Sequence, residues 1–213
     1  MGIILKRHIS ESAIVGLWEI TETVDELFSN VHLNEEENTL FKGFSNDLRK
    51  LHWLSYRNLL KELISTEEYS HVIYDEFGKP YLQYNSHHLS VSHAGKYSAA
   101  IVNKNSPVGI DIEKTLPRIH KITHKFLSEK ELKNIPPENN TDSLYVCWGA
   151  KEALYKLYGK QELLFQENIL LNPFVYSETG FITGTISIND FTQEYKLYYE
   201  KMQDYMLVYT ADC

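Results

Sequence analysis

Two carboxylates in the segment at 108–113, which reads VGIDIE, are the first candidates for chemistry in this sequence. The β-branched residues of the segment alternate with Gly109, Asp111 and Glu113, which is the period-two pattern of a strand with one apolar face. Asp111 and Glu113 therefore share a face, about 6.6 Å apart along the strand at roughly 3.3 Å per residue. That spacing lets both carboxyl groups converge on one small cation. Gly109 lies on the same face and is expected to leave it open.

The segment at 148–156, WGAKEALYK, supplies a third carboxylate and a cation. It belongs to a helix predicted over 143–158, which Gly159 follows as the residue type that favours a helix end. Glu152 and Lys156 are one turn apart on this helix. Together with the strand carboxylates they would provide what metal-assisted phosphoryl transfer needs, namely oxygen ligands for Mg²⁺ and a cation that neutralises the leaving group.

Each of the two segments also has an ordinary interpretation. An Asp–x–Glu pair on a strand is common on a solvated sheet face, and a Glu–Lys pair one turn apart on a helix is a common surface pair that contributes a few tenths of a kcal/mol. The combination of the two segments is what favours a functional site.

The two segments together resemble the signature pair of the 4′-phosphopantetheinyl transferases, in particular the single-chain, Sfp-like type of the surfactin synthetase activators. The second motif, W–x–x–K–E–A–x–x–K, is filled at every position. Other segments agree with the family in the same order along the chain: FGKPYL at 77–82, LSVSHAGKY at 89–97 and KFLSEKEL at 125–132. The N-terminal third of the chain agrees only loosely.

The resemblance implies an α+β fold made of two similar α/β halves in a pseudo-twofold arrangement. The polar segment NKNSP, which ends in proline, is the candidate boundary between them. We therefore expect an N-terminal half at 1–103 with coenzyme A contacts, and a C-terminal half at 104–213 with the metal site and the carrier-protein docking surface. No internal repeat is visible in the sequence.

The activity that the resemblance implies is transfer of the 4′-phosphopantetheine group of coenzyme A to a serine of an apo acyl, peptidyl or aryl carrier protein. The reaction would depend on Mg²⁺, although oxygen ligands also suit Mn²⁺, and it would release adenosine 3′,5′-bisphosphate. Asp111, Glu113 and Glu152 would hold the metal. Glu152 would also accept the serine proton, and Lys156 would stabilise charge on the leaving oxygen.

The resemblance also implies a set of ligands for the phosphates of coenzyme A. The segment SHAGK would cradle the pyrophosphate, since turn N–H groups beside a polar side chain form an anion site. Ser92 lies next to His93 with no acid nearby, so the sequence excludes a Ser–His–Asp hydrolase. The expected coenzyme ligands are Arg57, Lys79, Ser92, His93, Lys151 and Lys156.

A basic segment at 118–127, RIHKITHKFL, stands out in a chain whose net charge is -8. We predict one amphipathic helix here, with Arg118, Lys121 and Lys125 as a docking surface for an acidic carrier protein that acts mainly on the association rate. The alternative is the exposed face of an ordinary amphipathic helix.

Composition limits the class of protein. The chain has 213 residues, 43% of them hydrophobic, which suffices for a substantial core. The acidic balance argues against non-specific nucleic-acid binding, and the lack of a long apolar run argues against a membrane span. The two cysteines, Cys147 and Cys213, form no metal-ligand or disulfide pattern. We expect a cytoplasmic monomer.

Coarse hydrophobic patterning and capping signals predict the remaining secondary-structure elements. Capping boxes are expected at Thr23 with Glu26 and at Ser128 with Glu131, and the acidic run at 35–38 is expected to be a solvated helix start. The sequence also leaves two functions other than the transferase open. One is a non-catalytic coenzyme A or carrier-protein binding module, and the other is a Mg²⁺-dependent phosphohydrolase with water as nucleophile. The other expected elements are a helix at 46–64 and strands at 3–5, 13–20, 72–74, 80–82, 88–92, 97–102, 174–176, 181–188, 195–199 and 206–210.

Overall fold

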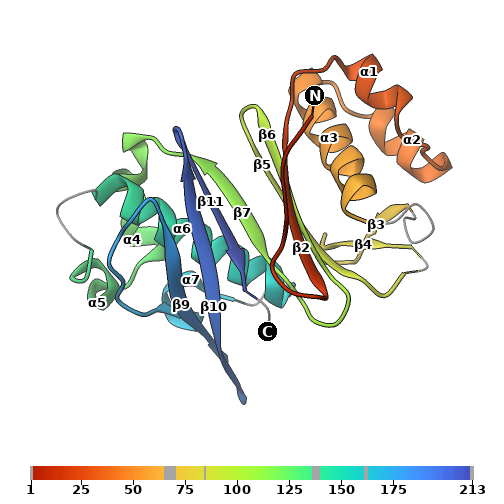
Figure 1. Ribbon diagram of the computed structural model, residues 1–213. Helices are drawn as coiled ribbons and strands as arrows, with labels where there is room; N and C mark the ends of the chain where they lie inside the picture. The colour runs from red at the N-terminus through yellow and green to blue at the C-terminus, as the bar shows by residue number, and fades with distance from the viewer. Residues whose placement is uncertain (1, 65–70, 84, 136–139, 161–162, 212–213) are drawn as a thin grey trace. The chain divides into compact units, whose positions relative to one another are not determined.

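The protein has an α+β fold that divides into two compact units, Met1–Ser106 and Pro107–Cys213. The computed structural model describes residues 2–64, 71–83, 85–135, 140–160 and 163–211. In each unit a long helix packs against an antiparallel sheet (Figure 1). The division falls three residues beyond the expected boundary between 103 and 104.

The N-terminal unit is built on a four-stranded sheet in the order β1-β2-β6-β5, with every neighbouring pair antiparallel. A separate pair, β3 with β4, flanks the turn that contains Gly78. The strands predicted in this half are confirmed in position. They are β1 (Ile3–His8), β2 (Ala13–Glu19), β3 (Val72–Tyr74), β4 (Pro80–Leu82), β5 (His88–Ala94) and β6 (Tyr97–Asn103).

Three helices complete this unit: α1 (Val24–Ser29), α2 (Glu35–Lys42) and α3 (Asp47–Leu63). The helix α3 begins after its N-cap Asn46, whose side chain accepts from two backbone N–H groups of the first turn. Its apolar side, which includes Leu54, Leu59 and Leu60, is fully buried against β2 and β6. The predicted capping box at the start of α1 is present.

The C-terminal unit contains a five-stranded antiparallel sheet in the order β7-β11-β10-β9-β8. The helix α6 (Asn140–Tyr158) lies against β7 and β11, as Figure 1 shows, and Gly159 follows it with a left-handed φ of 73°. The other helices are η1 (Pro117–Lys121), α4 (Thr123–Phe126), α5 (Glu129–Leu132) and α7 (Phe165–Asn168). The strands are β7 (Ile110–Lys114), β8 (Ile169–Leu171), β9 (Thr179–Ile188), β10 (Phe191–Met202) and β11 (Tyr205–Thr210).

Two element predictions in this unit are wrong. The basic segment at 118–127 is not one helix. The 3₁₀ helix η1 makes i→i+3 bonds and ends at Lys121, and Ile122, with a φ of -116° and a ψ of 2°, breaks the helical path before α4. Residues 174–176 form no strand. The aromatic rings of Phe174 and Tyr176 pack on Tyr199 of β10 at 5.8 and 6.2 Å between ring centroids, so packing, not strand pairing, explains that pattern.

No helix in the described part of the chain is long and apolar enough to cross a membrane.

Candidate active site

Strand β7 directs its two carboxylates toward α6. Asp111 lies opposite Val208 of β11 and Glu113 opposite Met206, and both of these partners belong to the core that α6 covers. Asp111 is only 3% exposed, whereas Glu113 is half-buried. The apolar residues that alternate with them on β7, Ile110 and Ile112, are buried as predicted.

Gly109 does not leave the carboxylate face open, so that expectation is wrong. A Cβ at this position would lie 1.8 Å from the carbonyl oxygen of Ala153 and 2.7 Å from its carbonyl carbon. The backbone of α6 therefore lies directly on the chain entering β7. Gly149 permits a second close approach, since its Cβ would lie 2.6 Å from Val208 and 3.7 Å from Asp111 Oδ2. The two glycines bring the helix residues onto the strand carboxylates.

Lys156 supplies the positive charge of the site. Its ammonium group donates to Asp111 Oδ1 at 2.7 Å and to the carbonyl oxygen of Ile110 at 3.1 Å. The lysine side chain is 28% exposed, whereas that of Asp111 is 5% exposed. The pair thus presents a partly accessible cation beside a buried carboxylate, which suits contact with an anionic ligand.

Glu152 and Glu113 lie in the electrostatic field of the same buried aspartate. Burial, followed by the charge of Asp111, raises the pKa of Glu152 to about 7, and Lys156 opposes this increase. Burial and Asp111 also raise the pKa of Glu113, against the Trp148 hydrogen bond and the nearby Lys156. Carboxylates that disfavour one another's ionisation define a region that attracts cations.

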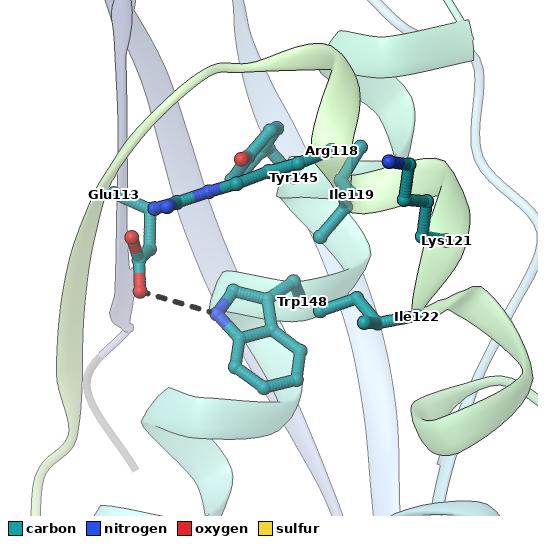
Figure 2. A pocket seen from close by; sticks show the side chains of 7 residues that line it. All are labelled: Glu113, Arg118, Ile119, Lys121, Ile122, Tyr145 and Trp148. Carbon is teal, nitrogen blue, oxygen red and sulfur yellow. Dashed lines mark hydrogen bonds between the residues drawn. The ribbon is translucent and has the colours of Figure 1, made fainter.

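Trp148 contacts one of the site carboxylates and also lines a pocket. Its indole Nε1 donates to Glu113 Oε1 at 3.4 Å, and its ring packs edge-on against Phe126 at 5.1 Å between centroids. Figure 2 shows Arg118 extending toward Glu113 while Trp148 forms one wall. The pocket has a volume of about 340 Å³ and is lined by Glu113, Arg118, Ile119, Lys121, Ile122, Tyr145 and Trp148.

The donor set of this site is compatible with Mg²⁺. Within the described ranges, no three His, Cys, Asp or Glu side chains are gathered closely enough to form a metal cluster. Even so, Asp111, Glu113 and Glu152 offer the carboxylate oxygens that Mg²⁺ prefers. Burial, and after it the charge of Asp111, raises the pKa values of Glu113 and Glu152, and a divalent cation would offset that local negative charge.

Lys151 does not join the other motif residues, and its expected role as a coenzyme ligand is contradicted. The side chain is fully buried. Its ammonium group donates to Glu131 at 3.0 Å and to the backbone carbonyl oxygens of Phe165 and Ile169 at 2.7 Å each. Three acceptors use all three of its protons, so none remains for a phosphate.

Arg57 is also buried, which contradicts its expected role as a coenzyme ligand. Its guanidinium lies over the ring of Trp53 at 3.2 Å, donates from Nε to Glu37 Oε1 at 3.0 Å and donates from Nη1 to the Tyr56 hydroxyl. Glu37 is 2% exposed, so the expectation of a solvated acidic run at 35–38 fails at this residue. The pair joins α2 to α3.

Arg57→Met is expected to destabilise the N-terminal unit without affecting coenzyme binding. Glu37 would keep His71 Nδ1 at 2.8 Å and the backbone N–H of Val72 as partners but would lose its buried cation, which costs up to about 3–5 kcal/mol of unfolding free energy. Arg49→Met is the matched control, because Arg49 on the same helix is exposed and contacts Phe44 through its guanidinium. Urea denaturation would measure both variants. A folded Arg57→Met protein with normal stability and a raised KM for coenzyme A would restore the original assignment.

Of the other predicted coenzyme ligands, Lys156 lies on α6, Ser92 and His93 lie in β5, and Lys79 directly precedes β4. Ser92 is buried within the strand, and His93 is exposed, with its ring stacked at 4.2 Å on the ring of His52. His52 Nε2 lies 2.7 Å from the carbonyl oxygen of Gly95. Burial lowers the pKa of Lys79, and the charge of Asp75 opposes this decrease. The coenzyme contacts of Lys79, Ser92 and His93 stay predictions.

Two residues make contacts with predicted site or motif residues that the sequence did not indicate. His52 lies within the helix predicted at 46–64 and had no predicted role, whereas in the structure its ring stacks on that of His93. Glu131 was assigned to a capping box, which is confirmed, and it also binds Lys151. The capping signature was the only local signal for Glu131, because its other partners are distant in sequence.

Comparison with known proteins supports the resemblance. A family model described as the 4′-phosphopantetheinyl transferase superfamily matches residues 107–207, slightly less than half of the chain. The matched part of the C-terminal unit is similar to that superfamily. The matched residues include all four charged groups of the site, and the resemblance to Sfp-like transferases is confirmed.

Individual relatives of this chain are bacterial. The chain is 36% identical over 89 residues to a 4′-phosphopantetheinyl transferase from Bacillus subtilis, covering 40% of this chain and 39% of the relative. Identity to the 4′-phosphopantetheinyl transferase Sfp of B. subtilis strain 168 is 34% over 89 residues, with the same coverage. Identity to the transferase gsp of Aneurinibacillus migulanus is 29% over 119 residues, or 50% and 49% of the two chains. The aligned regions thus span between two-fifths and half of these relatives.

Proposed function

We propose that this protein transfers the 4′-phosphopantetheine group of coenzyme A to a serine of an apo carrier protein. The observation that carries the proposal is the grouping of charged side chains on β7 and α6: Lys156 donates to Asp111 Oδ1 at 2.7 Å, and Glu113 and Glu152 both lie in the field of the same aspartate. Carboxylates that can hold a divalent cation beside a lysine suit phosphoryl transfer, and a positioned carboxylate can accept the proton of a hydroxyl. The superfamily that the C-terminal unit resembles and the names of the chain's relatives support the same reaction.

In the proposed reaction the serine oxygen forms a bond to the phosphorus that bears the pantetheine arm. Glu152 accepts the serine proton, and the bond from that phosphorus to the bridging oxygen breaks, releasing adenosine 3′,5′-bisphosphate. Lys156, whose ammonium donates to Asp111 Oδ1, would stabilise the negative charge that develops on the leaving oxygen. Asp111 holds Lys156 in place through its 2.7 Å hydrogen bond.

Asp111, Glu113 and Glu152 would hold Mg²⁺, with Mn²⁺ as a competent substitute. When bound, the ion would neutralise charge on the pyrophosphate. We propose that Trp148 orients Glu113 toward this position through its indole N–H.

In the N-terminal unit, Lys79, Ser92 and His93 are the proposed ligands of the coenzyme phosphates. Arg57 and Lys151 are withdrawn from this set because their polar groups are buried and bonded within the protein. We also propose that the protein acts as a monomer in the cytoplasm.

Intact mass spectrometry of an apo carrier protein incubated with this protein, coenzyme A and Mg²⁺ tests the function. A gain of one phosphopantetheine group that EDTA abolishes is the expected result. Release of free phosphopantetheine without carrier modification would favour a phosphohydrolase. Coenzyme A binding without either product, on acyl and peptidyl carriers alike, would favour a binding module.

The proposed docking surface consists of Arg118, Lys121 and Lys125, which are all exposed on η1 and α4. Lys121→Glu/Lys125→Glu is expected to lower kcat/KM for the carrier by about three- to tenfold and to flatten its salt dependence, because surface charges act mainly on association rate. Lys130→Glu/Lys133→Glu, which reverses two other exposed lysines, is the control matched in net charge. An equal loss in both variants would show that only net charge matters.

A further inference from the structure

We propose that Lys151 and Glu131 form a positioning pair that sets the placement of α6, and so holds Glu152 and Lys156 against the carboxylates of β7. The inference rests on the proposed function for its kinetic test, but its geometry is independent of it. Neither residue touches the reacting groups, so both would act through the helix.

The pair is buried and fully bonded. Lys151 Nζ lies 2.9 Å from Glu131 Oε1 and 3.0 Å from Oε2, and the two side chains are 0% and 7% exposed. The same ammonium also binds the carbonyl oxygens of Phe165 and Ile169, which are the first residues of α7 and β8. One side chain therefore ties α6 to three neighbouring elements.

Glu131 extends this connection on its own side. Its Oε2 accepts from the backbone N–H and the hydroxyl of Ser128, both at 2.8 Å, which fixes the start of α5. Its Oε1 accepts from the backbone N–H of Leu171 at 2.9 Å, which fixes the end of β8. A buried carboxylate with this many donors cannot shift without breaking several bonds at once.

The position of Lys151 on α6 explains why the pair would matter for the site. Consecutive helix residues point about 100° apart, so Lys151 faces away from the side that carries Ala153 and Lys156. On that opposite side the backbone at Ala153 touches Gly109. The helix is thus held by close packing on the β7 side and by the ion pair on the other. Removal of the ion pair leaves α6 free to rotate or slide by the small distances that matter in catalysis.

Three variants test whether the Lys151–Glu131 pair positions α6 or only stabilises the folded protein. Lys151→Met removes the cation and leaves the Glu131 charge buried, so its melting temperature should fall. Lys151→Met/Glu131→Gln removes both charges and should recover part of that loss. Lys133→Met, on the surface beyond α5, is the control. Each would be measured for melting temperature, kcat, KM for coenzyme A and Mn²⁺ affinity by electron paramagnetic resonance.

The double variant decides the proposal. We expect kcat and Mn²⁺ affinity to stay about 10–100-fold below wild type, the usual loss when a residue that supports metal ligands is removed, while KM for coenzyme A changes by less than about threefold. Wild-type kcat and Mn²⁺ affinity in the folded double variant would overturn the proposal. So would a Lys151→Met protein with normal kcat and a raised KM for coenzyme A, because that result makes Lys151 a coenzyme ligand.

The experiment also separates this inference from the proposed function. A wild-type protein that binds Mn²⁺ but modifies no carrier would overturn the function alone, and the Mn²⁺ affinities of the variants would still test the pair. A wild-type protein that neither binds Mn²⁺ nor modifies a carrier would overturn both.

Discussion

Glu152→Gln lowers the rate of carrier modification by about 10²–10⁴-fold, the usual contribution of a general base, while the protein stays folded. The amide keeps the size of the side chain but cannot accept the serine proton. Single-turnover mass spectrometry with saturating coenzyme A and Mg²⁺ would measure the loss. Glu129→Gln, at an exposed position of α5, is the matched control and should retain full activity.

The same substitution should stabilise the protein at alkaline pH in the absence of divalent ions. Folding raises the pKa of Glu152 from 4.5 to about 7, so the folded state disfavours the carboxylate. The free energy of unfolding therefore falls as pH rises from 4.5 to 7, and the full penalty remains above pH 7. At 1.36 kcal/mol per pKa unit, reduced for partial solvent contact, the penalty is roughly 1–3 kcal/mol.

Glutamine removes this penalty because it stays uncharged. Glu152→Gln is thus expected to melt about 2–12 °C above wild type at pH 8 in EDTA, at 2–4 °C per kcal/mol for a chain of this size, with no such gain about one unit below the unfolded pKa of 4.5. Scanning calorimetry at the two pH values would measure it. Normal carrier modification by Glu152→Gln would eliminate the base assignment, and an equal melting temperature at pH 8 would eliminate the electrostatic argument.

The sequence predicted those helices and strands whose residue pattern is set by local periodicity or by partners close in the chain. The alternation around Asp111 and the helical spacing of the leucines in α3 predicted a strand and a helix, and both elements are confirmed, although the structure buries Asp111 as well as its apolar neighbours and every residue of α3 from 52 to 60. The capping boxes were also predictable, because Ser128 and Glu131 are three residues apart and satisfy each other locally. Local signals suffice where the partner lies within one turn.

Sequence reasoning failed where the decisive partner is distant. Arg57 and Lys151 look like phosphate ligands because they are cations in recognisable motifs, but each is neutralised by a glutamate 20 residues earlier in the chain. No periodicity reports such a pair. The motif around Lys151 thus combines two roles: Glu152 and Lys156 face the site, whereas Lys151 faces the interior. Residue type alone does not tell which charged residues of this motif face the site and which face the interior.

Gly109 shows the same limit of sequence reasoning, and its substitution is the second change for which we expect a large effect. A period-two pattern identifies the face on which Gly109 lies, but it does not show what covers that face. In the structure the covering element is the backbone of α6. A glycine at this position is therefore a requirement of close packing, and any side chain would separate β7 from α6.

Gly109→Ala is expected to remove at least about 3 kcal/mol of stability from the C-terminal unit, at or above the upper end of the usual cost of overpacking. The added Cβ would lie 1.8 Å from the carbonyl oxygen of Ala153, and a backbone atom cannot rotate away as a side chain can. Any folded fraction should lose about 10²-fold in kcat, because a shift near 1 Å between Asp111 and Glu152 disrupts the arrangement of reacting groups. Urea denaturation and carrier modification would measure the two losses.

Gly43→Ala is the matched control for this substitution. Gly43 follows α2 with a φ of -75°, and the nearest atom to an added Cβ is the carbonyl oxygen of Leu40 at 3.3 Å. We expect a change within about 1 kcal/mol for this variant. If Gly109→Ala were as stable and as active as Gly43→Ala, the close approach of α6 to β7 would not be what brings the four charged groups together. The order of causes proposed for the site, from glycine contact to helix position to carboxylate geometry, would then fail at its first step.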